Sequence, residues 1–286
     1  MRVLNLFLIS ILLTPLQSRA QAPKPASNMH SAVSHDGTRI VFESDRNGNS
    51  DIYIMNVDGT NERRLTDNNA DDTLPGWTRD GARITFQSNR DQRRQPWPYY
   101  TMNPDGTDVQ SLDNLDGIFK RWSPDGSKIL SFEGHEGNTD IYIMNADGSE
   151  KKRLTTDPAY DSDMEFSPDG TKIVYESFVG DLSTAKILVM DIEGGNKTYL
   201  ADGTDPEWSP DGSRIIYKAR NAAGKCCDIY IMKADGSGQK QLAEMGYFHR
   251  FLPDGSRIIF FALAGDTYQI YSMNPDGSDK QPLTHP

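Results

Sequence analysis

The chain has 286 residues, a formal net charge of −11 and two cysteines. The excess of acidic residues argues against nucleic-acid binding, which uses a basic surface. The cysteines, Cys226 and Cys227, are adjacent and cannot cross-link distant segments. Two states remain open for this pair: free thiols, or a strained vicinal disulfide of the kind that an oxidising compartment permits.

The first twenty residues have the pattern of a secretory signal peptide. A positive start precedes a mostly apolar run over residues 3–16, and Ser-Arg-Ala at 18–20 is a small-x-small cleavage site. The apolar run is too short to span a membrane. We therefore expect residues 1–20 to be a signal peptide and 21–29 a short N-terminal segment. The mature protein is expected in the periplasm or outside the cell, without a membrane span.

From residue 30 onward, one short sequence motif recurs six times. Each copy holds an Asp-Gly turn followed by Ile and further apolar residues, as in Trp208-Ser-Pro-Asp-Gly-Ser-Arg-Ile-Ile-Tyr217. Neighbouring copies are 42 to 45 residues apart, a period typical of solenoids, propellers and arrays. The turn aspartates are Asp36, Asp80, Asp125, Asp169, Asp211 and Asp254.

A second sequence motif follows each copy of the first, as in Asp140-Ile-Tyr-Ile-Met-Asn-Ala-Asp-Gly148. In the turn of each motif, Pro or Asp suits the central positions, and Gly occupies the next position, where the backbone is left-handed. This is the chemistry of a three-residue hairpin loop with a bulge glycine. Each repeat therefore carries two tight hairpins and, with them, four antiparallel strands.

The strands of a repeat are expected to differ in burial, with the second strand buried and the fourth exposed. The second strand, such as Ile258-Ile-Phe-Phe261, is apolar on successive residues and must be covered on both faces. The fourth carries Lys and Arg, which discourage edge pairing. We predict an all-β fold: a six-bladed β-propeller of four-stranded antiparallel blades over residues 30–286. Trp122 and Trp208 are expected to pack between neighbouring blades.

The pairing of Trp-Ser-Pro-Asp-Gly-Ser-Lys-Ile with Asp-Ile-Tyr-Ile-Met-Asn-Ala-Asp-Gly-Ser and Arg-Leu-Thr resembles the WD-like repeats of the TolB-like propeller family. The resemblance covers residues 30 to 284 and implies a six-bladed periplasmic propeller. TolB carries an α/β domain before its propeller, which this sequence lacks, so a true Tol–Pal role does not follow. Related repeats occur in oligogalacturonate lyases and in prolyl-oligopeptidase-type peptidases, but there is no Gly-x-Ser-x-Gly elbow for a peptidase.

The long, unlike loops between repeats are expected to converge on one mouth of the channel, opposite the Asp-Gly turns. Variable loops on a rigid scaffold are a favourable place for binding. We predict a partner-binding site of Arg121, Glu165, Glu207, His249, Arg250, His30, Asp163 and Asp205. Two alternatives remain: ion pairs joining Arg121 to Glu165 and Glu207 to Arg250, or a His–His–Asp metal site that includes both histidines.

The sequence thus favours an exported, monomeric, non-enzymatic scaffold that binds a protein or cell-envelope partner. It contains no nucleophile–base set and no strong metal spacing, and we assign it no catalytic residue, metal or cofactor. The competing hypothesis is a metal-dependent polysaccharide lyase related to the oligogalacturonate lyases, which rely on channel histidines and a metal.

Overall fold

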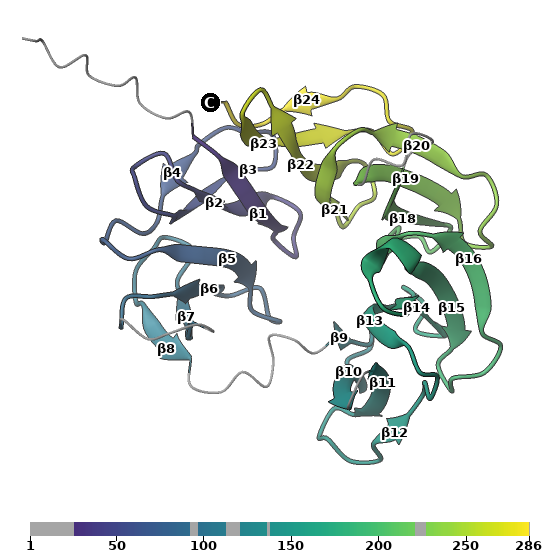
Figure 1. The fold of residues 1–286 in the computed structure, drawn as a ribbon. Coiled ribbons are helices and arrows are strands. Elements are labelled where there is room, and N and C mark those ends of the chain that lie inside the picture. Colours follow the sequence, from purple (N-terminus) through teal and green to yellow (C-terminus); the bar gives the residue numbers. More distant parts are fainter. Residues whose placement is uncertain (1–25, 92–96, 113–120, 136–137, 221–226, 286) are drawn as a thin grey trace, which may run out of the picture.

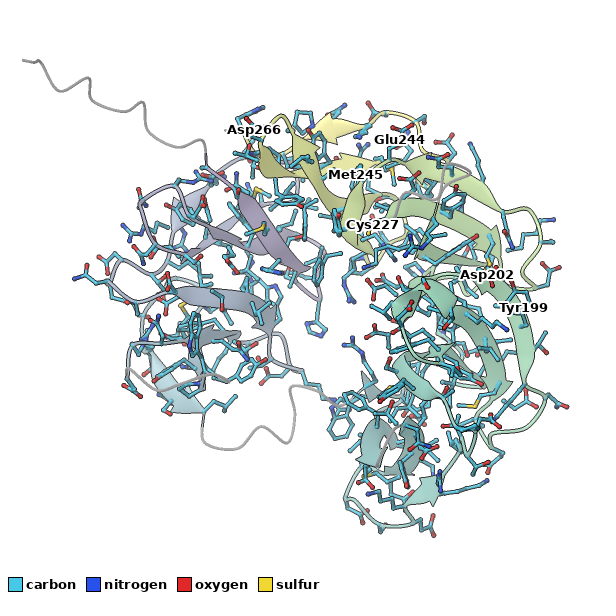
Figure 2. The ribbon with its side chains drawn as sticks, viewed as in Figure 1. Tyr199, Asp202, Cys227, Glu244, Met245 and Asp266 are labelled. Atoms are coloured by element: carbon cyan, nitrogen blue, oxygen red, sulfur yellow. The ribbon has the colours of Figure 1, made fainter. Side chains whose placement is uncertain are left out.

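The computed structural model describes residues 26–91, 97–112, 121–135, 138–220 and 227–285. The predicted signal peptide and Cys226 lie outside these residues. Cys227 lies just before β19 and is labelled in Figure 2; it is disulfide-bonded. The choice between free thiols and a vicinal disulfide involves Cys226 and so lies outside the described residues.

Each sequence repeat folds into four consecutive strands. The first holds β1 (Asn28–Val33), β2 (Arg39–Ser44), β3 (Asp51–Asn56) and β4 (Arg63–Arg64). The second holds β5 (Asp72–Trp77), β6 (Ile84–Ser88), β7 (Tyr99–Met102) and β8 (Gln110–Leu112). The third holds β9 (Arg121–Trp122), β10 (Lys128–His135), β11 (Asn138–Asn145) and β12 (Lys152–Arg153).

The last three repeats continue the pattern. The fourth holds β13 (Tyr160–Phe166), β14 (Lys172–Phe178), the 3-10 helix η1 (Leu182–Thr184), β15 (Lys186–Asp191) and β16 (Thr198–Asp202). The fifth holds β17 (Thr204–Trp208), β18 (Arg214–Ala219), β19 (Asp228–Lys233) and β20 (Lys240–Ala243). The sixth holds β21 (Gly246–Phe251), β22 (Ile258–Ala264), β23 (Thr267–Met273) and β24 (Gln281–Pro282).

Within each repeat, consecutive strands pair antiparallel, so the predicted all-β fold of four-stranded units is confirmed. The third and fourth repeats share one eight-stranded sheet, because Thr139 of β11 pairs in parallel with Tyr160 of β13. None of the described sheets closes on itself. Figure 1 shows the units arranged around a central opening, with β1, β5, β13 and β21 nearest to it and β8, β12, β16 and β24 at the rim.

The core lies between neighbouring units rather than at one centre. Val41 and Ile52 of the first repeat, for example, pack against Phe86 and Met102 of the second. This arrangement explains the apolar runs of the second and third strands, because a sheet that lies between two neighbours is covered on both faces. Around the ring, each such contact buries side chains whose transfer from water stabilises the fold.

The Asp-Gly turns have the predicted chemistry. The Asp211 carboxylate accepts hydrogen bonds from the Ser209 hydroxyl (2.6 Å) and the Ser213 backbone N–H (3.0 Å), which lower the pKa of Asp211 to about 2. Gly212 follows with a φ of 69°, in the left-handed region that glycine adopts without steric cost. The aspartates of these turns therefore serve local geometry, and they account for part of the acidic charge.

The two tryptophans differ. Trp208 is 6% exposed and belongs to a hydrophobic cluster between the fourth and fifth repeats, as predicted. Trp122 also lies against the neighbouring repeat, but it is only half-buried. Its ring meets the guanidinium carbon of Arg79, 3.9 Å from the ring centroid, instead of an apolar neighbour from the second repeat.

In the part of the chain that the structure describes, no helix is long and apolar enough to span a membrane.

Candidate functional site

The inner strands share a β-bulge near the mouth that carries the long loops. The pairing register shifts in β1, β5, β13, β17 and β21. At each bulge one residue other than glycine has a φ between 44° and 50°: His30, Leu74, Asp163, Asp205 and Phe248. Positive φ is uncommon for such residues and bulges redirect side chains, so this ring of positions is a candidate for function.

The structure brings seven of the eight predicted site residues around one cavity of about 170 Å³: Arg121, Asp163, Glu165, Asp205, Glu207, His249 and Arg250. In Figure 2, side chains project from the inner strands into the central opening. His30 is the exception. Its Nδ1 lies 2.9 Å from Glu43 Oε2, and its ring makes an edge contact with Phe248, with centroids 5.1 Å apart.

Glu165 and Glu207 link neighbouring inner strands. Glu165 Oε2 accepts the backbone N–H of Trp208, and Glu207 Oε1 accepts that of Phe251, both at 2.9 Å. Arg250 Nε is also 3.8 Å from Glu207 Oε2, so the predicted Glu207–Arg250 ion pair exists as a long contact. Both glutamates therefore have a structural role, and Arg121 and Arg250 are the cationic side chains that line the cavity.

Three carboxylates meet beside this cavity. Oxygens of Asp163, Glu176 and Asp205 all lie within 4.8 Å of one another, and Lys218 Nζ pairs with Asp205. Burial, the Glu176 charge and a hydrogen bond to Asp205 raise the pKa of Asp163 to about 7. Burial also acts on Asp205, but Lys218 outweighs it and lowers the pKa of that carboxyl. Asp205 is thus ionised at neutral pH, whereas Asp163 titrates close to neutral pH.

Three further groups that line the cavity have shifted pKa values. Burial raises the pKa of Glu207 to about 7, against the charge of Arg250 and with a contribution from Glu165. Burial raises the pKa of Glu165 as well. Burial lowers the pKa of His249 to about 4, so its ring is neutral at pH 7, and its Nε2 donates to the Asp205 backbone oxygen at 2.9 Å.

The carboxylate cluster has the donor chemistry of a divalent-cation site, since hard cations prefer oxygen ligands. Lys218 already neutralises one of its members, which opposes cation binding. Among the described residues, the group that could hold a metal contains no histidine. The His–His–Asp alternative is therefore wrong in its ligands, because His30 contacts Glu43 and His249 is committed to the Asp205 backbone.

Four residues at this mouth escaped the sequence analysis: Leu74, Phe248, Glu176 and Lys218. Glu176 and Lys218 follow the aromatic residue of the second strand in their repeats, and Glu43 stands at the same position in the first. Glu43 accepts the backbone N–H of Leu74 (3.3 Å) and Glu176 that of Asp205 (3.2 Å). Comparing this position across the repeats would have shown it to be charged and variable.

Comparisons with known proteins place the chain among relatives of the same architecture. A "Tol-Pal system protein TolB" of Anaeromyxobacter dehalogenans is 33% identical over 129 residues, which are 43% of this chain and 28% of that relative. The matched region thus spans under a third of the relative's length.

Two solved structures share the fold. TolB from Acinetobacter baumannii superposes with a TM-score of 0.61 at 21% identity, covering 90% of this chain and 62% of the other. An oligogalacturonate lyase in complex with manganese superposes with a TM-score of 0.61 at 12% identity, covering 87% and 90%.

The sequence model of the TolB beta propeller domain matches residues 8–117 and 112–286. This match covers all of the described strands, and the repeat pattern and the four-stranded units agree with it. The chain therefore belongs to the TolB beta propeller domain family.

Proposed function

We propose that the protein is an exported, non-enzymatic binding module that recognises a protein or cell-envelope partner through the long-loop mouth of its channel. One observation carries the proposal: seven of the predicted residues, from four different repeats, line a single cavity at this mouth. The opposite face is built from uniform Asp-Gly turns. A relative named for the Tol-Pal system supports a partner of protein nature.

The mouth combines two kinds of recognition chemistry. Exposed Arg121 and Arg250 stand among buried carboxylates, and Leu74 and Phe248 leave 40% and 48% of their surface exposed nearby. Arginine and aromatic side chains are frequent anchors in interfaces. Charged groups on a rigid rim act mainly on encounter rate and specificity. A partner is thus expected to present an apolar group together with charge.

Arg121→Glu should weaken partner capture from a native cell-envelope extract by roughly tenfold at low salt, and less at high salt. Arg121 is exposed, so the thermal midpoint should change little. Quantitative mass spectrometry of captured material measures the effect.

Lys172→Glu is the matched control for this charge reversal. It makes the same change at an exposed lysine just after an Asp-Gly turn, on the opposite face. If Lys172→Glu abolishes capture while Arg121→Glu does not, the binding site lies on the turn face and the proposal is wrong.

We also propose that each of the six four-stranded units is one blade and that residues 1–20 are removed on export. An experimental structure of the mature protein should then show six blades, and its intact mass should correspond to a chain starting near Gln21. A seventh blade, an open sandwich, or a mature protein that retains residues 1–20 would each contradict its part of this proposal.

The second candidate is a metal-dependent polysaccharide lyase. The carboxylate cluster Asp163, Glu176 and Asp205 favours it, because these oxygens could bind a divalent cation. Titration calorimetry with Mn²⁺ and ultraviolet detection of unsaturated products from acidic oligosaccharides would discriminate the two. Binding together with product formation, both lost in Glu176→Gln, would establish the lyase in place of the scaffold.

A further inference from the structure

The boundary between the first and last repeats, where the two ends of the chain meet, is tightly joined. A cluster of nine buried hydrophobic residues crosses it, including Phe42, Met55 and Phe261. Hydrogen bonds reinforce it: Gln269 receives the Asn28 side-chain amide (2.7 Å) and donates to the Ala26 backbone oxygen (2.9 Å). The chain ends are therefore not the weak point of the ring.

Hydrophobic clusters join the other neighbouring units as well, with one exception. Among the described residues, clusters cross the boundaries of the first and second, third and fourth, fourth and fifth, and fifth and sixth repeats. None of these clusters joins β5–β8 to β9–β12. In Figure 1 these two units are also the neighbours whose ribbons lie farthest apart.

The residues at this boundary explain the difference. Ser131 stands where the other five repeats have an aromatic residue: Phe42, Phe86, Tyr175, Tyr217 and Phe260. Thr85 stands where they have Val, Leu or Ile. By strand alternation, Ser131 faces the second repeat and Thr85 the third. Each of the two sheets that face this boundary therefore lacks the apolar side chain that packs the other boundaries.

Burial confirms that this boundary is loosely packed. Met144 is half-buried, whereas its counterparts Met55, Met102, Met190, Met232 and Met273 are at most 1% exposed. The Ser131 hydroxyl is buried without a hydrogen-bond partner, which is costly unless the site opens to water. A buried apolar cluster, as at the other boundaries, would instead hold the two units together.

A cavity of about 900 Å³ extends from the channel to this boundary. Thr85, Tyr99 and Leu112 line it on the second repeat, and Trp122 on the third. Near the channel, the guanidinium of exposed Arg79 contacts the Trp122 ring across this boundary. Such a cation–π contact at an exposed site is weak compared with a hydrophobic cluster.

We infer that the ring is split between β5–β8 and β9–β12, and that it opens and recloses at this seam rather than where the chain ends meet. The remaining units form one continuous stack from the third repeat through the sixth and first to the second, because a hydrophobic cluster joins each pair. Opening at the seam would give the channel a lateral entrance in addition to its two mouths.

Hydrogen exchange of the full chain, followed by mass spectrometry, tests the inference. Amides of β6 and β10, on either side of the seam, should exchange about tenfold or more faster than those of β14 and β18. Equal protection of all four strands, or fastest exchange in β2 and β22 where the chain ends meet, would overturn it.

The variant Thr85→Val/Ser131→Phe restores the residue types of the other boundaries. It should slow exchange in β6 and β10 towards the rate of β14 and β18, and should leave those two strands unchanged. If the double variant fails to fold, Thr85→Val alone, which keeps the side-chain shape, should still slow exchange in β6. A folded variant whose seam exchanges at the wild-type rate would contradict the inference.

Discussion

Trp208→Ala should lower the free energy of unfolding by about 3–5 kcal/mol, the cost of removing a large buried aromatic side chain. The Trp208 side chain is 6% exposed and packs among Val174, Ile187 and Tyr217 between the fourth and fifth repeats. Its removal leaves a cavity that two rigid sheets cannot readily collapse around. Urea unfolding monitored by circular dichroism measures the change.

Trp122→Ala is the matched variant at the equivalent position of another repeat. Trp122 is half-buried and its ring is covered by the guanidinium of exposed Arg79, so we expect a loss of roughly 1 kcal/mol, the range of an exposed cation–π contact. Equal losses for the two variants would show that both boundaries are packed alike. That result would also count against the proposed seam.

The sequence predicts the fold because two simple signals repeat together. The Asp-Gly turns set the strand register, as the Asp211 turn shows, and the doubly apolar strands require neighbours on both faces. The split at one boundary was also readable, since Ser131 and Thr85 break patterns that the other repeats keep. The repeat period shows what the six copies share, whereas the split depends on where one copy departs from the others.

The site was less predictable, for physical reasons. Charges near the channel mouth could be listed from the sequence, but not their partners: Glu165 binds a backbone N–H of the next repeat, which no side-chain pattern reveals. The bulge that turns Leu74 and Phe248 into left-handed geometry is equally invisible, because neither residue type favours positive φ. The acid cluster depends on contacts between strands of adjacent repeats.

Stability should depend on pH through the carboxyl groups at the channel mouth. Asp163 and Glu207 have folded-state pKa values raised to about 7, and the pKa values of Glu165 and Glu176 are raised as well. A raised carboxyl pKa means that the folded state binds more protons than the unfolded chain. Its stabilising contribution is therefore full below the unfolded value and is lost as pH rises through about 7.

His249 acts in the opposite sense. Its pKa is lowered to about 4, so it favours the folded state above its unfolded value of 6.5 and this contribution is lost as pH falls through 4. Its shift is similar in size to that of Glu207, which rises from 4.5 to about 7 and corresponds to roughly 3 kcal/mol. These two nearly cancel between pH 5 and 6.5, and the other raised carboxyls decide the sign. The turn aspartates, such as Asp211 with a pKa of about 2, act only below pH 4.

We therefore expect the free energy of unfolding to be higher at pH 5 than at pH 8. Glu207→Gln should remove part of this difference, because the neutral amide cannot ionise beside buried Glu165. Glu150→Gln, at an exposed glutamate on the surface, is the control and should leave the difference unchanged. Urea unfolding at a series of pH values measures all three proteins. A wild-type protein that is more stable at pH 8 than at pH 5 would mean that His249 outweighs the carboxyls, and that the acid cluster is ionised in the folded state.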